Sequence, residues 1–120
     1  MSKIPVWIDV DTGVDDSAAL LVAAKLPQLD IRGISACAGN TQLCNTFENT
    51  RRVCALMGRT DIPVYPGAEK PLFRPLETAP LVHGVGGLGK AELPPSPAPV
   101  ETKKAWDAIY EAAVAAEGEL

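Results

Sequence analysis

Four aspartates crowd into one short segment of the chain, residues 9–16, where their carboxylates could bind a hard metal ion. The segment reads Asp-Val-Asp-Thr-Gly-Val-Asp-Asp and follows the apolar run Pro-Val-Trp-Ile. Carboxylates this close together repel one another, and each raises the pKa of its neighbours unless a cation is present. All the candidate ligands are oxygens, with no His or Cys near them in the sequence, and this favours Ca²⁺ or Mg²⁺ over zinc.

The elements around this segment are a strand before it and a helix after it, and the remaining chain continues the alternation. We predict strands at residues 5–8, 31–37 and 62–65, and helices at residues 17–26, 42–57 and 102–116. Helices that connect successive strands indicate a parallel sheet, so the predicted fold class is α/β, with an open, mostly parallel sheet and flanking helices. The chain ends just as another strand could begin at residues 119–120, so we expect the domain to be incomplete at its C-terminus.

The predicted elements also suggest how the acids converge. The acidic segment would lie at the carboxyl end of a parallel strand, where open α/β sheets bind their ligands. Because side chains alternate along a strand, Asp9 and Asp11 should point the same way. Gly13 permits a tight turn, which would bring Asp15 and Asp16 at the helix N-terminus back towards Asp11.

Composition excludes several classes of protein. The 120 residues are 47% hydrophobic and 22% charged, as in one ordinary globular domain, and the net charge of −4 gives no electrostatic basis for a nucleic acid or membrane partner. The N-terminus does not read as a signal peptide, and no apolar stretch is long enough to span a membrane. Three cysteines in no metal-binding pattern indicate free thiols in a reducing compartment, so we expect a cytoplasmic protein.

The acidic motif resembles that of a known family. Asp-x-Asp-x-Gly-x-Asp-Asp, after an apolar strand and before an alanine- and leucine-rich helix, is similar to the nucleoside hydrolases (inosine–uridine-preferring nucleoside N-ribohydrolases). Three further stretches resemble the family in the same order, at residues 38–41, 58–72 and 83–89. The resemblance covers essentially the whole chain and implies a Rossmann-like sheet, with residues 1–120 as the N-terminal part of a single α/β domain.

The resemblance implies an enzyme that hydrolyses the N-glycosidic bond of ribonucleosides to free base and ribose, with Ca²⁺ as cofactor. Asp11 would ligate the Ca²⁺ and act as general base on a metal-bound water. Asp16 would be a further Ca²⁺ ligand. Asp9 would either hold these acids in place without binding the ion itself or lie on the ribose side of the site.

The resemblance also implies which residues meet the substrate. Asp15 would bind a ribose hydroxyl, Asn40 would contact the ribose or support the metal ligands, and His83 would lie near the nucleobase. Val85 and Gly86 stand where the family pattern has polar residues, so base preference does not follow from this loop.

The family's remaining metal ligands come from later in longer chains. We therefore expect residues 1–120 to be inactive alone, and the exposed sheet edge of such a chain favours homo-oligomers. Two alternatives stay open. One is a haloacid dehalogenase-type phosphatase, since Asp9-Val10-Asp11 satisfies its Asp-x-Asp signature, and the other is a non-catalytic truncated fragment. Arg51 and Arg52, on a helix face, should be solvated.

Overall fold

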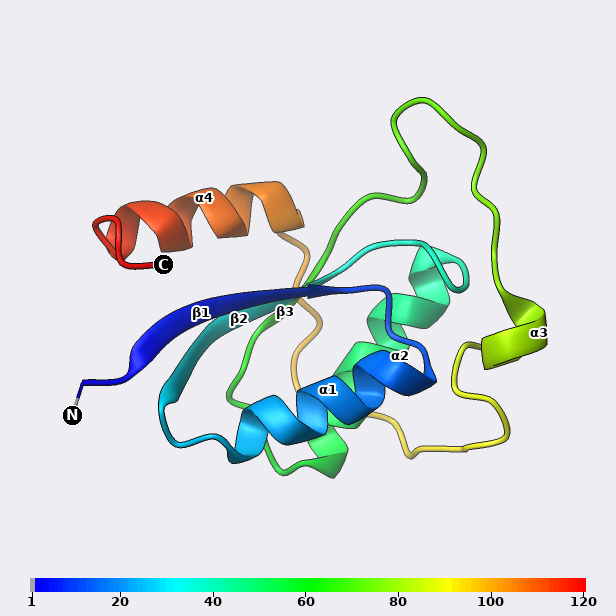
Figure 1. The fold of residues 1–120 in the computed structure, drawn as a ribbon, viewed down its shortest axis with the longest axis horizontal. Helices are drawn as coiled ribbons and strands as arrows, with labels where there is room; N and C mark the ends of the chain where they lie inside the picture. Colours follow the sequence, from blue (N-terminus) through cyan, green and yellow to red (C-terminus); the bar gives the residue numbers. More distant parts are fainter. Residues whose placement is uncertain (1) are drawn as a thin grey trace.

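The computed structural model describes residues 2–120 and places a three-stranded sheet between helices (Figure 1). All strands are parallel in the order β1-β2-β3, with α1 and α2 on one face and α4 on the other. This confirms the predicted α/β class. The strands are β1 (Ile4–Val10), β2 (Leu29–Ala36) and β3 (Val64–Pro66), and the helices are α1 (Val14–Lys25), α2 (Leu43–Leu56), α3 (Pro80–His83) and α4 (Ala105–Ala115).

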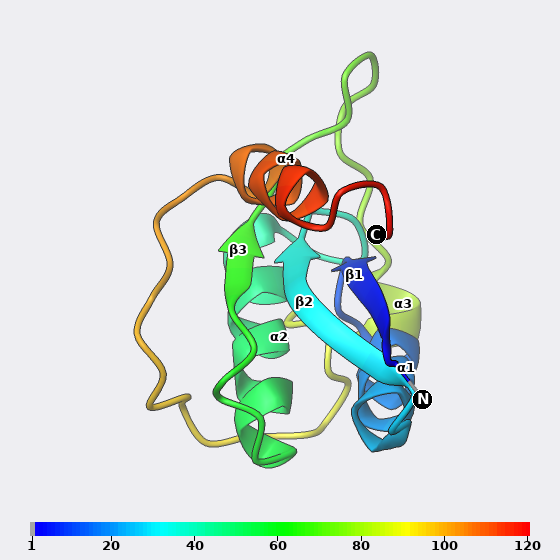
Figure 2. The same ribbon diagram turned by 90° about the vertical axis from the view of Figure 1, so that its left-hand side faces the viewer.

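Strand pairing determines which segments meet beyond the sheet. β1 pairs with β2 as far as Val10 opposite Ala36, and Ala36 in turn pairs with Pro66 of β3. Because the strands are parallel, their carboxyl ends lie at the same edge of the sheet (Figure 2). The segments that follow β1 and β2, beginning at Asp11 and Cys37, therefore emerge side by side.

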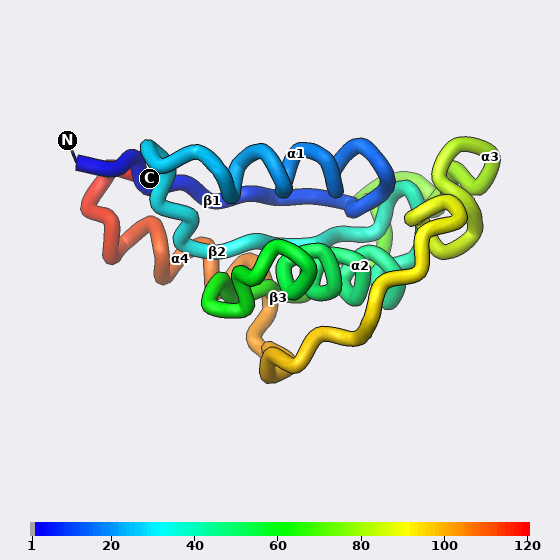
Figure 3. Tube along the Cα trace, turned by 90° about the horizontal axis from the view of Figure 1, so that it is seen from below, coloured from blue at the N-terminus to red at the C-terminus, as the bar shows by residue number. Residues whose placement is uncertain are grey.

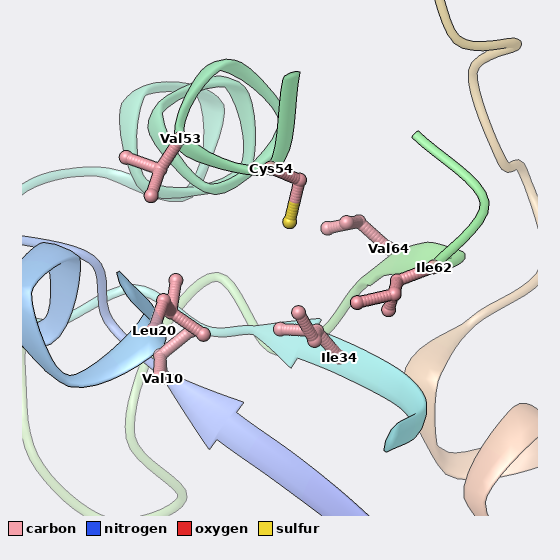
Figure 4. Packing of buried hydrophobic residues seen from close by; sticks show 7 residues of the cluster. All are labelled: Val10, Leu20, Ile34, Val53, Cys54, Ile62 and Val64. Atoms are coloured by element: carbon pink, nitrogen blue, oxygen red, sulfur yellow. The ribbon is translucent and has the colours of Figure 1, made fainter. Parts of the chain in front are cut away.

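A small aliphatic core fixes the sheet against α1 and α2 (Figure 4). β-Branched residues of the strands point towards the helices, and Leu20 of α1 and Ile34 of β2 are almost completely buried. Each such side chain contributes about 1.5–3 kcal/mol when it leaves water. The core cluster consists of Val10, Leu20, Ile34, Val53, Cys54, Ile62 and Val64.

Several element boundaries differ from the sequence prediction. α1 begins at Val14 instead of residue 17, so Asp15 and Asp16 belong to its first turn. The single-turn helix α3 was not predicted, because one turn leaves no apolar periodicity in the sequence. Residues 119–120 form no strand. No helix within residues 2–120 is long and apolar enough to cross a membrane.

The long segment between α3 and α4 runs beside α2 (Figure 3). Arg51 donates a hydrogen bond of 2.6 Å to the carbonyl of Ala98, and Arg52 donates one of 2.8 Å to that of Leu93. The carboxylate of Glu48 accepts from both arginines. The expectation that these arginines are solvated was therefore wrong for Arg51, which is 8% exposed, and incomplete for Arg52.

Candidate active site

Asp11 is held in place by the residues that follow the neighbouring strand. The backbone N–H of Asn40 donates to the Asp11 carboxylate at 2.9 Å, and the Asn40 side-chain amide donates to the Asp11 carbonyl at 3.0 Å. Gly39 allows this approach, because a Cβ at that position would overlap the Asp11 carboxylate oxygen Oδ2. Asp11 and Asn40 therefore lie in contact at one edge of the sheet.

Asp16 lies against Asp11. Its carboxylate accepts the backbone N–H of Asp11 at 3.1 Å. The pKa of Asp16 is raised from 3.8 to about 6, first by burial and then by the side-chain contact with Asp11, while the charges of Asp11 and Asp15 add smaller contributions. Two carboxylates thus share one small space, in which a positive charge would relieve their repulsion.

His83 packs on the turn between Asp11 and the helix. Its Nδ1 accepts the backbone N–H of Val14 at 3.1 Å and lies 3.9 Å from a carboxylate oxygen of Asp15. Since Nδ1 is an acceptor, a neutral His83 carries its proton on Nε2. Gly13 makes room for the ring, because a Cβ there would lie 2.5 Å from His83 Nδ1 and 2.8 Å from Asn40 Nδ2. The hydrogen bond from Val14 and the space left by Gly13 thus allow His83 to lie against the acidic segment.

Asp15 and Asp9 are less enclosed than the other two acids. The side chain of Asp15 is 75% exposed, so it faces solvent beside His83. Asp9 accepts a hydrogen bond from the hydroxyl of Ser35, which itself accepts the indole N–H of Trp7 at 3.0 Å. Asp9 is thus tied to β2 rather than to Asn40.

Cys37 lies close to the acidic cluster. Burial raises the pKa of its thiol, and the negative charges of Asp9, Asp11 and Asp16 raise it further. The thiol is therefore kept protonated at neutral pH, as expected for an unreactive cysteine.

Sequence reasoning missed a second set of polar residues, which surrounds Thr12. Thr12 is fully buried, and its hydroxyl pairs with that of Thr50 at 2.7 Å. Its carbonyl accepts from the side chain of Asn49. A recognisable signal was present, since polar residues recur at the helical spacing of Thr41, Asn45 and Asn49, and the last two lie in α2.

The site supplies few potential metal ligands of its own. Within residues 2–120, no group of three or more His, Cys, Asp or Glu side chains could hold a metal ion. The contacting pair of Asp11 and Asp16 offers two carboxylates, and the donors are oxygens, as hard cations prefer.

Curated relatives of this chain include a uridine nucleosidase and a ribonucleoside hydrolase. A uridine nucleosidase of Saccharomyces cerevisiae is 42% identical over an alignment that covers 100% of this chain and 36% of that protein. The pyrimidine-specific ribonucleoside hydrolase RihA of Citrobacter koseri is 46% identical over 80% of this chain and 31% of its own length. The chain thus spans about a third of the curated relatives that it matches.

Solved structures that match this chain are also of nucleoside hydrolases. A purine-preferring ribonucleoside hydrolase from Gardnerella vaginalis matches with a TM-score of 0.87 and 28% identity, covering 93% of this chain and 37% of that one. The plant nucleoside hydrolase PpNRh1 matches with a TM-score of 0.85 and 31% identity, covering 92% and 36%. Residues 6–120 match the protein family described as inosine-uridine preferring nucleoside hydrolase. The chain therefore belongs to the inosine-uridine preferring nucleoside hydrolase family.

Proposed function

We propose that this chain carries the metal- and ribose-binding part of an enzyme that hydrolyses the N-glycosidic bond of ribonucleosides. The observation that carries the proposal is the contact between the carboxylates of Asp11 and Asp16 at the carboxyl edge of the sheet, with Asn40 bracing Asp11. Family membership supports the reaction class. Since the chain spans about a third of its relatives, we assign the activity to the intact gene product.

The acid pair fits a divalent cation of the Ca²⁺ type. Asp11 and Asp16 would hold the ion, because both present oxygen donors and because burial, followed by the contact with Asp11, raises the pKa of Asp16. Bound Ca²⁺ would orient the vicinal hydroxyls of the ribose and make a water molecule more acidic. The phosphatase alternative loses its support, because the family match includes the same aspartates.

Asp11 would act as the general base. It would take a proton from the attacking water while the bond from that oxygen to the ribose C1′ forms. The C1′–N bond breaks, and its electron pair leaves with the base. Positive charge develops on the sugar in between, and the carboxylates of Asp15 and Asp16 would stabilise it.

Two other side chains would position the substrate. The Asn40 amide nitrogen already donates to Asp11, so its carbonyl oxygen is the group left to accept from a ribose hydroxyl. His83 accepts from Val14 through Nδ1, so its Nε2–H would remain available to donate to the leaving base. Asp9, which accepts a hydrogen bond from Ser35, would add negative charge near the site.

The intact gene product, incubated with inosine, uridine, cytidine and adenosine, tests the proposal. We expect free base and ribose in equal amounts from at least one nucleoside, with loss of activity in EDTA and recovery with Ca²⁺. A phosphate ester with Mg²⁺ serves as control and should stay intact. Absence of release from every ribonucleoside would contradict the proposal.

A further inference from the structure

Asn49 of α2 joins two segments that are both distant from it in sequence. Its side-chain amide nitrogen donates to the carbonyl of Gly86 at 2.7 Å and to the carbonyl of Thr12 at 3.3 Å. The residue is 8% exposed. Both N–H bonds of one amide group are thus used, one on the acidic segment and one on the glycine-rich loop after α3.

Neighbouring side chains hold the same two segments. Thr41 donates to the carbonyl of Val85 at 2.8 Å, and Asn45 donates to the Thr41 hydroxyl at 3.0 Å. On the other side, the hydroxyls of Thr50 and Thr12 pair at 2.7 Å. Only Asn49 reaches both segments directly through these hydrogen bonds.

Gly87 brings the loop backbone onto this junction. It has a φ of +95°, which favours glycine, and a Cβ there would lie 2.8 Å from Asn49 Nδ2 and 3.2 Å from the Thr12 carbonyl. The loop can therefore close on Asn49 only because residue 87 lacks a side chain.

The two joined segments carry the candidate catalytic groups. Thr12 directly follows Asp11, and the loop directly follows His83, which accepts the Val14 N–H. We propose that Asn49 is a positioning residue: by bridging the carbonyls of Thr12 and Gly86 it sets the distance between His83 and Asp11. This inference rests on the proposed function, and Asn49 itself would not touch the substrate.

Asn49→Asp tests the bridge, because it keeps the shape of the side chain and removes both donors. In the intact gene product, we expect kcat to fall about 10–100-fold with KM nearly unchanged, since a displaced catalytic group slows the chemical step. Backbone amides of residues 84–89 should exchange with solvent faster. The matched control is Thr46→Val, since Thr46 is fully buried on the same helix and its hydroxyl bonds only to Leu43 of that helix.

Each result decides the matter. Slower turnover together with faster exchange in Asn49→Asp, but not in Thr46→Val, supports positioning. Faster exchange with unchanged kcat overturns it, and so does equal behaviour of the two variants. If Asn49→Asp does not fold, Gly87→Ala disturbs the same junction from the loop side and should give the same two effects. If the wild-type protein cleaves no nucleoside, the proposed function fails, whereas exchange still shows whether Asn49 bridges the segments.

Discussion

The backbone N–H of Asp11 donates to the carboxylate of Asp16, five residues further along the chain, in the first turn of α1. This bond closes the acidic segment on itself and brings the two carboxylates into contact. Asn40 then fixes Asp11 from the neighbouring strand. We derive three predictions from this arrangement, beyond the test of Asn49, and a fourth from the ion pairs of Glu48 with Arg51 and Arg52.

Asp11→Asn should lower kcat of the intact gene product by about 10²–10⁴-fold, the usual range for removing a general base. The fold should be retained, because the asparagine carbonyl oxygen can still accept the Asn40 N–H. Steady-state kinetics with the best nucleoside substrate measures the effect. Asp30→Asn is the control, since Asp30 pairs with Arg32 on the surface. An Asp11→Asn variant as active as this control would remove Asp11 from the mechanism.

Ca²⁺ should stabilise the wild-type protein but not Asp16→Asn, because the variant lacks one of the two proposed ligands. At about a hundredfold excess over Kd, binding to the folded state alone adds about 2.7 kcal/mol. Scanning calorimetry of the intact gene product with Ca²⁺ and with EDTA measures the change in Tm. Asp61→Asn, which removes the exposed partner of Arg59, should keep the full response. An equal response in Asp16→Asn would place the ion elsewhere.

Gly39→Ala should lower kcat by on the order of 10²-fold, because its Cβ would push the Asp11 carboxylate out of position. Gly58→Ala provides the contrast. At Gly58 the φ is +70°, and a Cβ there would meet no described residue other than the adjacent chain, so this change should cost stability and spare catalysis. Kinetics and thermal unfolding of both variants separate the two effects. An unchanged kcat in Gly39→Ala would show that catalysis does not depend on the exact position of the Asp11 carboxylate.

Glu48→Gln should weaken the fold at neutral pH and less so in acid. Burial raises the pKa of Glu48, but the hydrogen bonds and charges of Arg52 and Arg51 outweigh it and lower the pKa below 4.5. A lowered pKa means that the charged form stabilises the fold above pH 4.5, and that this contribution is lost as the pH falls through the lowered value.

Urea unfolding of Glu48→Gln at several pH values checks this. We expect a loss of roughly 1 kcal/mol at pH 7, allowing for solvent screening, and a smaller difference near pH 3. Glu111→Gln, which removes an exposed pair with Lys103, should have no measurable effect at either pH. If Glu48→Gln lowers the free energy of unfolding equally at every pH, the loss would come from side-chain packing and not from the charge of Glu48.

Local sequence was enough to predict the acidic segment and its surroundings. An apolar strand, a glycine turn and a helix start lie next to one another in the chain, so Asp11 and Asp16 meet through contacts only five residues apart. The meeting with Asn40 was also predictable, because consecutive parallel strands end at one edge of the sheet.

Contacts over longer separations could not be predicted in this way. The Val14–His83 bond spans 69 residues, and its length and direction depend on how the loop after α3 lies on α2. Arg51 was expected in solvent because it lies on a predicted helix face, yet it donates to a backbone carbonyl 47 residues away. The spacing of polar residues along a helix does not indicate which distant backbone carbonyl one of them will bind.

The sequence by itself determined the α/β class, the four-aspartate segment and the family resemblance, because these depend on residue type and short spacing. Only the tertiary structure decided that His83 lies on the acidic turn and that Asn49 bridges Thr12 to Gly86. Both depend on backbone carbonyls and amides, which every residue carries and which become specific partners only when distant segments are packed together.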